Sequence, residues 1–175
     1  MSSAPPFVLT LKLDQPSFAY LDDLRRQHFP PARNIVPAHI TLFHALPGEQ
    51  EPALRRTLHD ICAQTQPFEL TLPTLRFLGR GVALEIASPG LLQLRHELAI
   101  VWGAWLSAQD QQRYRPHITI QNKTAPHQAR QLYDQLVSAW TPRTAQGEGL
   151  LLWRYVGGPW ELAAEFAFEG DPDQR

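Results

Sequence analysis

The chain has one cysteine, Cys62, and one methionine among its 175 residues. A single cysteine excludes a disulfide bond within the chain and any zinc site built from several cysteines. The charges almost cancel, with a formal net charge of −1 at pH 7. We therefore expect no general electrostatic attraction to long nucleic acids.

Long apolar runs are also missing. No stretch of eighteen uninterrupted apolar residues occurs, so the sequence predicts no membrane span and no binding to membranes. The N-terminal segment MSSAPPF lacks the basic and apolar parts of a secretory signal, and we expect a cytoplasmic protein. The hydrophobic content of 43% is typical of a folded protein, and the length suits a single domain.

What the sequence does contain is a repeated triplet, His-Ile-Thr. It occurs at 39–41 and at 117–119, each time in a short apolar segment that follows a proline, PAHITLF and RPHITIQ. Residues i and i+2 of a strand share a face, so each copy presents one imidazole and one hydroxyl to the same side. Two such strands side by side would surround one small space with two histidines and two threonines.

The pattern of apolar residues predicts the secondary structure around these motifs. We expect strands at 7–13, 37–43, 67–78, 81–87, 116–121, 149–156 and 160–168, and helices at 16–28, 52–65, 89–106 and 126–140. Each half of the chain then contains a helix, a motif strand, a second helix and paired strands. We infer an α+β protein, a single bilobal domain over 1–175 with pseudo-repeat halves of about 7–87 and 88–168 and the motif strands at its centre.

The four motif residues suit acid–base chemistry on a phosphate ester. Histidine has an unperturbed pKa near neutrality, so His39 and His117 can serve as an acid and a base. The hydroxyl groups of Thr41 and Thr119 can donate to phosphate oxygens. The simplest structural alternative is a pair of strand histidines whose hydrogen bonds are satisfied. A zinc site at the two histidines would need a third ligand that the motifs do not supply.

Residues next to the motifs are candidates for substrate contacts. Continuing the alternation of the second strand places Arg115 and Gln121 on the face of His117, and Arg115 is the candidate phosphate contact. Lys123 shares this parity beyond the expected strand end and is a second candidate. Phe43 shares the face of His39 and is a candidate for stacking on a base or ribose, with core packing as the alternative. His44 has the opposite parity, and we expect it to face elsewhere.

Two further features lie outside the motifs. Lys12 would line the cleft if strand 7–13 neighbours the motif strands. Trp153 and Tyr155 share one face of a late strand; aromatic residues at this period are usually core residues, and stacking on a substrate is the alternative.

PAHITLF and RPHITIQ, together with the order and spacing of the elements, resemble the two-histidine (2H) phosphoesterase superfamily, in its branch of 2'-5' RNA ligases and RNA 2',3'-cyclic phosphodiesterases. The resemblance covers nearly the whole chain. It implies a bilobal pseudo-twofold fold in which antiparallel sheets line a central cleft and helices lie outside. It also implies phosphodiester chemistry without metal or other cofactor, with His39 as acid and His117 as base. Many members carry an arginine five residues after the second histidine, where this chain has Asn122.

The expected function is therefore a hydrolase, a cyclic phosphodiesterase acting on an RNA end or a small nucleotide with a cyclic phosphate. One alternative is 2'-5' RNA ligation, which is the reverse reaction at the same site. A non-catalytic nucleotide- or RNA-binding module and a metallohydrolase are the other two. We expect a monomer with no obligatory protein partner.

Overall fold

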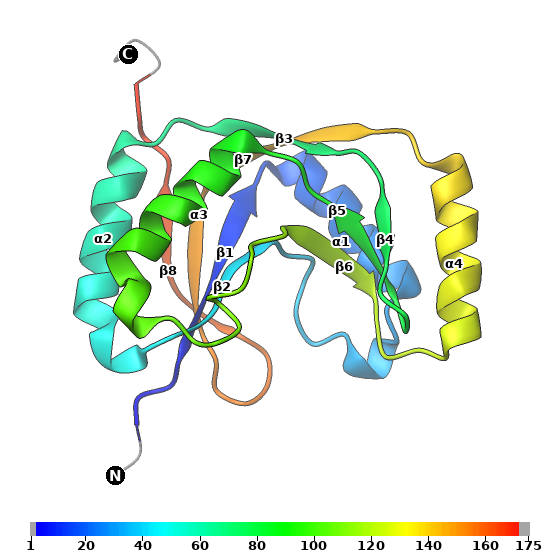
Figure 1. The fold of residues 1–175 in the computed structure, drawn as a ribbon, viewed down its shortest axis with the longest axis horizontal. Coiled ribbons are helices and arrows are strands. Elements are labelled where there is room, and N and C mark those ends of the chain that lie inside the picture. Colours follow the sequence, from blue (N-terminus) through cyan, green and yellow to red (C-terminus); the bar gives the residue numbers. More distant parts are fainter. Residues whose placement is uncertain (1–2, 172–175) are drawn as a thin grey trace.

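The computed structural model of the protein describes residues 3–171. Helices and strands alternate along most of the chain, as Figure 1 shows. Three short 3-10 helices lie between them, at Pro31–Arg33, Gly48–Gln50 and Gly103–Trp105. The main elements are β1 (Phe7–Leu13), α1 (Gln15–His28), β2 (Thr41–Leu46), α2 (Glu51–Gln64), β3 (Phe68–Leu72), β4 (Leu75–Phe77), β5 (Val82–Glu85), α3 (Pro89–Trp102), β6 (His117–Gln121), α4 (Pro126–Ala139), β7 (Arg143–Arg154) and β8 (Glu161–Ala167).

The strands form two antiparallel sheets. The larger sheet has five strands, in the order β2-β1-β7-β3, with β8 also paired to β7. The smaller sheet has the order β4-β5-β6. The α+β class with antiparallel sheets is therefore confirmed. The sheets are not the two halves of the chain, because the larger sheet takes strands from both ends of the sequence.

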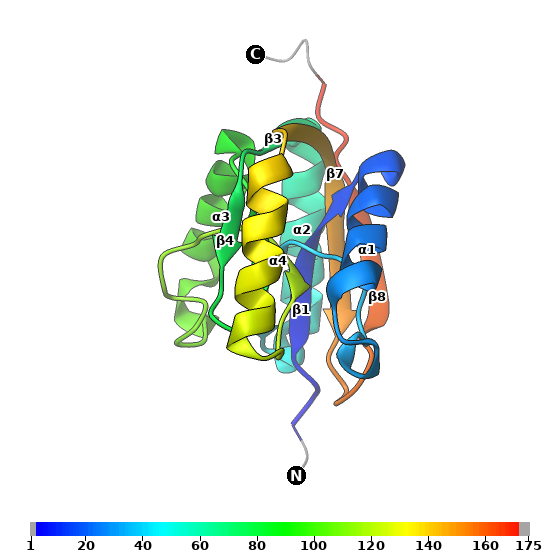
Figure 2. The ribbon, with the colours of Figure 1, turned by 90° about the vertical axis from the view of Figure 1, so that its right-hand side faces the viewer.

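Two helices leave the sheet to which they are joined in sequence. Helix α1 connects β1 and β2 of the larger sheet but packs against β6 of the smaller sheet. Helix α3 connects β5 and β6 of the smaller sheet but packs against β3 of the larger one. Helices α2 and α4 complete the outer layers, α2 against β7 and β8 and α4 against β4 and β5 (Figures 1 and 2). Each sheet is thus covered by one helix from its own part of the chain and one exchanged helix.

Local sequence signals explain where the helices begin. The Asp14 carboxylate accepts a hydrogen bond from the backbone N–H of Ser17 and caps α1, and Ser88 caps α3 in the same way through Leu91. All four α-helices of the described chain carry a proline in their first turn, where its missing N–H costs no hydrogen bond. None of the helices within 3–171 is long and apolar enough to cross a membrane.

Some element bounds differ from the sequence prediction. The predicted strand 67–78 is divided by Pro73 and Thr74 into β3 and β4, which belong to different sheets. A proline lacks the N–H that a strand interior needs, so the sheet pairing changes there. Helix α3 ends at Trp102, followed by a 3-10 turn, instead of continuing to Leu106. Strand β7 begins at Arg143, six residues before the predicted start.

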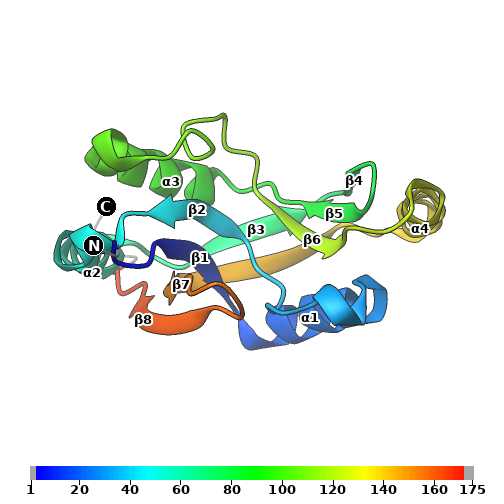
Figure 3. The same ribbon diagram turned by 90° about the horizontal axis from the view of Figure 1, so that it is seen from below.

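The turn from β4 into β5 needs a glycine at position 81. A Cβ added at Gly81 would lie 1.9 Å from the carbonyl oxygen of Gln121. Only a residue without a side chain lets β5 approach the end of β6 this closely. The position of the second motif strand therefore depends on Gly81. Figure 3 shows β2 and β6 near each other at the middle of the molecule, seen from below.

Candidate active site

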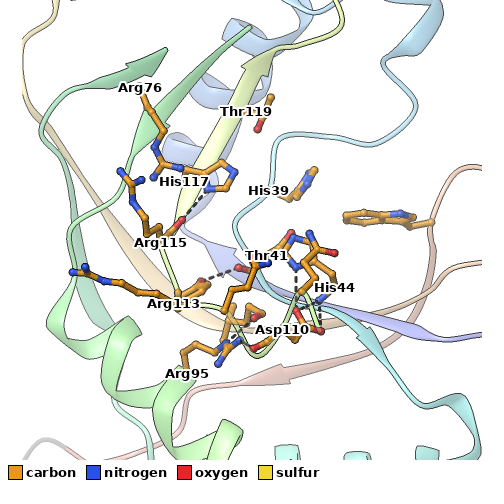
Figure 4. A pocket seen from close by; sticks show the side chains of 15 residues that line it. His39, Thr41, His44, Arg76, Arg95, Asp110, Arg113, Arg115, His117 and Thr119 are labelled. Atoms are coloured by element: carbon orange, nitrogen blue, oxygen red, sulfur yellow. Dashed lines mark hydrogen bonds and ion pairs between the residues drawn. The ribbon is translucent and has the colours of Figure 1, made fainter. Parts of the chain in front are cut away.

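Both His-Ile-Thr motifs contribute to one cavity of about 430 Å³ between the sheets. Figure 4 shows His39 and His117 facing each other across it, with Thr41 and Thr119 nearby. The sequence prediction that the four motif side chains share one space therefore agrees with the structure. The other lining residues are Leu42, His44, Arg76, Arg95, Gln109, Asp110, Gln112, Arg113, Tyr114, Arg115 and Trp160.

The alternation of each motif follows from burial of its apolar residues. Ile40 and Ile118 are fully buried between the two cavity-lining positions of their motifs. His39 precedes the first residue of β2, yet its segment is held to the sheet, because the N–H of Leu11 donates to the carbonyl of Ile40 at 3.0 Å. His117 is the first residue of β6. The sheets therefore hold the backbone of both histidines, through Ile40 for His39 and through β6 for His117.

Each imidazole is oriented by the carbonyl oxygen two residues before it. Nδ1 of His39 lies 2.8 Å from the oxygen of Pro37, and Nδ1 of His117 lies 2.8 Å from the oxygen of Arg115. A carbonyl oxygen only accepts, so Nδ1 carries the proton and donates it. In the neutral ring this leaves Nε2 without a proton and able to accept one. The two histidines therefore have the same tautomer and the same kind of support.

Burial favours the neutral form of both rings in the free protein. The pKa of His39 is lowered from 6.5 to about 4, mainly by burial and additionally by the charge of Arg25, with the Pro37 carbonyl acting in the opposite direction. Burial also lowers the pKa of His117, with the Arg115 carbonyl acting in the opposite direction. Arg76 lowers the pKa of His117 and Glu85 raises it. An anion bound between the rings would favour their protonated forms.

The regular alternation ends directly after each motif threonine. In the pairing of β1 with β2, Thr10 is opposite Thr41 and Leu9 is opposite Phe43, so the register shifts at Leu42. In the pairing of β5 with β6, Ala83 is opposite Thr119 and Val82 is opposite Gln121, with the same kind of shift. A β-bulge turns the following side chains to the other face. Each motif therefore has its own bulge at the residue after its threonine.

The bulges correct three predictions. Phe43 does not face the cavity: it is fully buried, and its ring packs against Trp102 of α3 with centroids 5.3 Å apart. The predicted substrate contact at Phe43 is therefore wrong, and its role is core packing. Gln121 is likewise buried and does not line the cavity. His44, which was expected to face elsewhere, lines the cavity instead.

His44 is held by a buried carboxylate. Asp110 accepts hydrogen bonds from the backbone N–H groups of His44 and Ala45 and lies 3.1 Å from Nδ1 of His44. Burial would raise the pKa of Asp110, but the hydrogen bonds from His44 and Ala45 lower it below its ordinary value. The contact fastens the segment between α3 and β6, which carries Arg113 and Arg115, to the end of β2.

Cationic side chains surround His117. Arg115 lines the cavity as predicted, and its Nη2 lies 3.4 Å from Glu85. Arg76 of β4 lines it too and holds Glu85 through two hydrogen bonds, Nη2 to Oε2 at 2.9 Å and Nε to Oε1. Glu85 is directly opposite His117 in the sheet. One carboxylate therefore has two guanidinium partners, and this corner of the cavity keeps an excess of positive charge.

Lys123 is not part of this group. It is exposed, has a positive φ of 60° beyond the end of β6, and is not among the residues that line the cavity. Lys123 therefore does not line the cavity at which the predicted phosphate contact would be made. The strand ends at Gln121, so alternation no longer controls the direction of Lys123.

Two buried arginines support the motif strands from behind. Arg25 of α1 donates from Nη1 to the carbonyl of Thr119 at 2.8 Å, and Arg95 of α3 donates from Nε to the carbonyl of Leu42 at 2.8 Å. Arg95 also lies over the Phe43 ring, 4.0 Å from its centroid. Each exchanged helix thus binds the backbone of a motif strand in the sheet that it covers.

Sequence reasoning missed most of these supporting residues. Arg113 lines the cavity from the segment before β6, where strand alternation does not control the direction of a side chain. Arg76, Arg95 and Asp110 come from separate elements and carry no local signal. In the part of the chain that is described, no group of three or more His, Cys, Asp or Glu side chains is arranged to hold a metal ion.

Comparison with known proteins gives a family match and similar folds. The family described as the 2'-5' RNA ligase superfamily matches residues 13–159. No curated protein matches the chain. The fold is similar to that of TT0787 of Thermus thermophilus, with 19% identity, a TM-score of 0.68, and coverage of 95% of this chain and 99% of that one.

Two other solved structures are also similar. The first is E. coli LigT complexed with 3'-AMP, with 20% identity, a TM-score of 0.64, and coverage of 94% of this chain and 98% of that one. The second is a phosphoesterase with 21% identity, a TM-score of 0.60, and coverage of 94% and 98%.

Proposed function

This chain belongs to the 2'-5' RNA ligase superfamily. We propose that it is a metal-independent phosphodiesterase that opens 2',3'-cyclic phosphates of nucleotides or RNA ends. The observation that carries the proposal is the matched pair of imidazoles on one cavity, each with Nδ1 bound to a carbonyl and Nε2 left for proton transfer. A binding module would not need two titrating groups with the same tautomer.

Hydrolysis needs one proton acceptor and one proton donor. Following the resemblance, Nε2 of His117 takes a proton from the attacking water as its oxygen bonds to phosphorus. The bond from phosphorus to one ribose oxygen breaks, and Nε2–H of His39 gives that oxygen a proton. The product is a ribose with a phosphate monoester on the neighbouring hydroxyl. After one turnover His117 has gained a proton and His39 has lost one, so a proton must pass from His117 to His39, directly or through water, before the next turnover.

For His39 to be the acid, its pKa must rise on substrate binding. Burial holds the pKa of His39 at about 4 in the free protein. A phosphodiester anion next to the ring favours the imidazolium form, so the bound substrate would itself raise the pKa of His39. The acid would thus form where and when the substrate is present.

Charge on the phosphate would be met by neutral and cationic donors. Thr41 and Thr119 offer hydroxyl groups beside the histidines. Arg76 and Arg115 supply the positive charge that two threonines lack, and they take the place of the arginine that many family members carry where this chain has Asn122. Donors fixed in advance stabilise the developing negative charge without reorganisation.

The test is hydrolysis of nucleoside 2',3'-cyclic phosphates in the presence of excess EDTA. We expect turnover by the wild type and a loss of about 10²-fold to 10⁴-fold on His39→Ala or His117→Ala. His59→Ala is the matched control, because His59 is exposed on α2, and it should keep full activity. Full activity in either active-site variant would rule out the two-histidine mechanism. Binding without turnover over a wide panel of cyclic phosphates would favour a binding module, and loss of activity in EDTA would favour a metallohydrolase.

A second activity, 2'-5' RNA ligation, has support from the same geometry. Because the two imidazoles have the same tautomer and support, each can take the role of the other when the reaction runs backwards. Ligation would join a 2',3'-cyclic phosphate end to a hydroxyl end in place of water. Incubation of the two RNA fragments, followed by digestion with a nuclease specific for 3'-5' linkages, would detect the resistant 2'-5' bond.

A further inference from the structure

A second cavity, of about 250 Å³, lies beside the active-site cavity and shares His39 and Trp160 with it. Its walls are largely apolar and aromatic, in contrast to the arginine-rich walls around His117. Polar groups occur at Lys12, Gln15 and Glu165, and Lys12 is ion-paired with Glu165. Thr10, Trp153 and Leu162 also line this cavity.

Two tryptophans connect this cavity to the catalytic histidine. The Trp160 ring meets His39 edge-on, with centroids 4.7 Å apart and an interplanar angle of 60°. Trp153 lies beyond it, with its centroid 6.2 Å from that of Trp160. Trp153 is fixed from β1, because its Nε1 donates to the hydroxyl of Thr10 at 2.8 Å. Both side chains are only partly buried, so both keep surface available to a ligand.

The direction of the reaction places the sugar on this side. In an in-line displacement the entering water and the departing oxygen lie on opposite sides of phosphorus. The acid protonates the departing ribose oxygen, so the ribose belongs on the side of His39, away from His117. The base attached to that ribose then lies beyond His39, where Trp160 and the second cavity begin.

We propose that this second cavity is a nucleobase subsite, in which the base of the nucleotide that carries the cyclic phosphate packs against Trp160 and Trp153. The inference rests on the proposed function and on the assignment of His39 as the acid. Every base has an aromatic face, so stacking on tryptophan gives affinity without strict selection among bases. The alternative position, among Arg76, Arg113 and Arg115, suits phosphates better than an uncharged ring.

Base-dependent catalysis provides the first test. Two variants perturb the subsite without touching the histidines: Trp153→Leu removes one wall, and Leu162→Glu adds a charge to a residue that is 50% exposed at the cavity. We expect each to lower kcat/KM for adenosine 2',3'-cyclic phosphate by about tenfold, mainly through KM. Hydrolysis of the base-free analogue, 1-O-methylribose 2,3-cyclic phosphate, should be unchanged. Leu92→Glu on α3, at a residue that is 46% exposed and lines neither cavity, is the matched control.

Ligand binding provides a test that does not need turnover. By calorimetry, the wild type should bind 3'-AMP at least tenfold more tightly than inorganic phosphate, and both subsite variants should reduce this ratio. Equal affinities for the two ligands, or a ratio that neither variant changes, would overturn the subsite whatever the enzyme does. If 3'-AMP binding depends on the subsite but no cyclic phosphate is hydrolysed, the subsite stands and the proposed reaction fails. A variant that slows the base-free and nucleoside substrates equally would also count against the subsite, because its effect would not depend on the base.

Discussion

The guanidinium group of Arg25 donates a hydrogen bond to the carbonyl oxygen of Thr119, 2.8 Å away and 94 residues later in the chain. Arg25 is 4% exposed, and its charge also contributes to the lowered pKa of His39. One side chain of α1 thus holds the backbone of the second motif and influences the imidazole of the first. The stability of the fold and the proton affinity of His39 are therefore linked through Arg25.

Replacing Arg25 by methionine should separate the two effects. We expect Arg25→Met to lower the free energy of unfolding by about 1–3 kcal/mol, because the buried Thr119 carbonyl loses a donor. The pKa of His39 should rise, since a neighbouring positive charge is removed. Urea denaturation and NMR titration of the His39 ring would measure the two changes. Arg26→Met is the control, because Arg26 is largely exposed and pairs with carboxylates of its own helix. An unchanged His39 pKa in Arg25→Met would contradict this account.

Stability should fall as the pH falls from about 6.5 to 4. In this range an unfolded histidine binds a proton, whereas folded His39, with a pKa of about 4, does not. Protonation therefore favours the unfolded state, by at most about 3 kcal/mol for this one residue at low pH. His39→Gln should flatten the pH dependence of the free energy of unfolding, measured by urea denaturation at pH 7 and pH 4.5. His59→Gln, at an exposed position, should leave the slope unchanged.

The assignment of acid and base can be tested with a better leaving group. A nitrophenolate leaves without a proton, so an ester such as thymidine 5'-(4-nitrophenyl) phosphate needs the base but not the acid. If His39 is the acid, His39→Ala should lose about 10²-fold to 10⁴-fold on cyclic phosphates and much less on the nitrophenyl ester. His117→Ala should lose activity on both. The opposite pattern would assign the acid to His117.

The buried carboxylate of Asp110 should matter for both folding and substrate affinity. Asparagine in its place would present an amide N–H₂ to N–H donors, so we expect Asp110→Asn to lower the free energy of unfolding by about 1–3 kcal/mol. KM should rise more than kcat falls, because the segment that carries Arg113 and Arg115 loses its attachment to β2. Asp60→Asn is the matched control: Asp60 also contacts a histidine, His59, but both are exposed. A KM that is unchanged in Asp110→Asn would show that the segment is held by other contacts.

The core of the site could be predicted from sequence because it depends on local geometry. Alternation along an extended strand relates a histidine to the threonine two residues later, and the buried isoleucine between them fixes the direction of both. The same reasoning failed one step further on, at Phe43 and His44. A bulge after the threonine reverses the alternation, and no residue in the segment signals it.

Contacts between distant elements could not be predicted. The pairing of Arg25 with Thr119 and of Arg95 with Leu42 depends on which sheet a helix covers, and amphipathic periodicity gives the buried face of a helix but not its partner. The division of 67–78 at Pro73 had a visible signal, since a proline disfavours a strand interior. Trp160 follows a turn of glycines and proline, and its position beside His39 depends on how β7 and β8 pair.

The exchange of α1 and α3 has a consequence for how this protein can move. Opening the molecule like a hinge would pull α1 from β6 and α3 from β3, exposing apolar surface on both sides and breaking the hydrogen bonds of two buried arginines. The spacing of the imidazoles is therefore set during folding and not by closure around a substrate. Neither half of the chain, expressed alone, contains the partners that its own helix requires, so a functional protein cannot be assembled from two independently folded pieces.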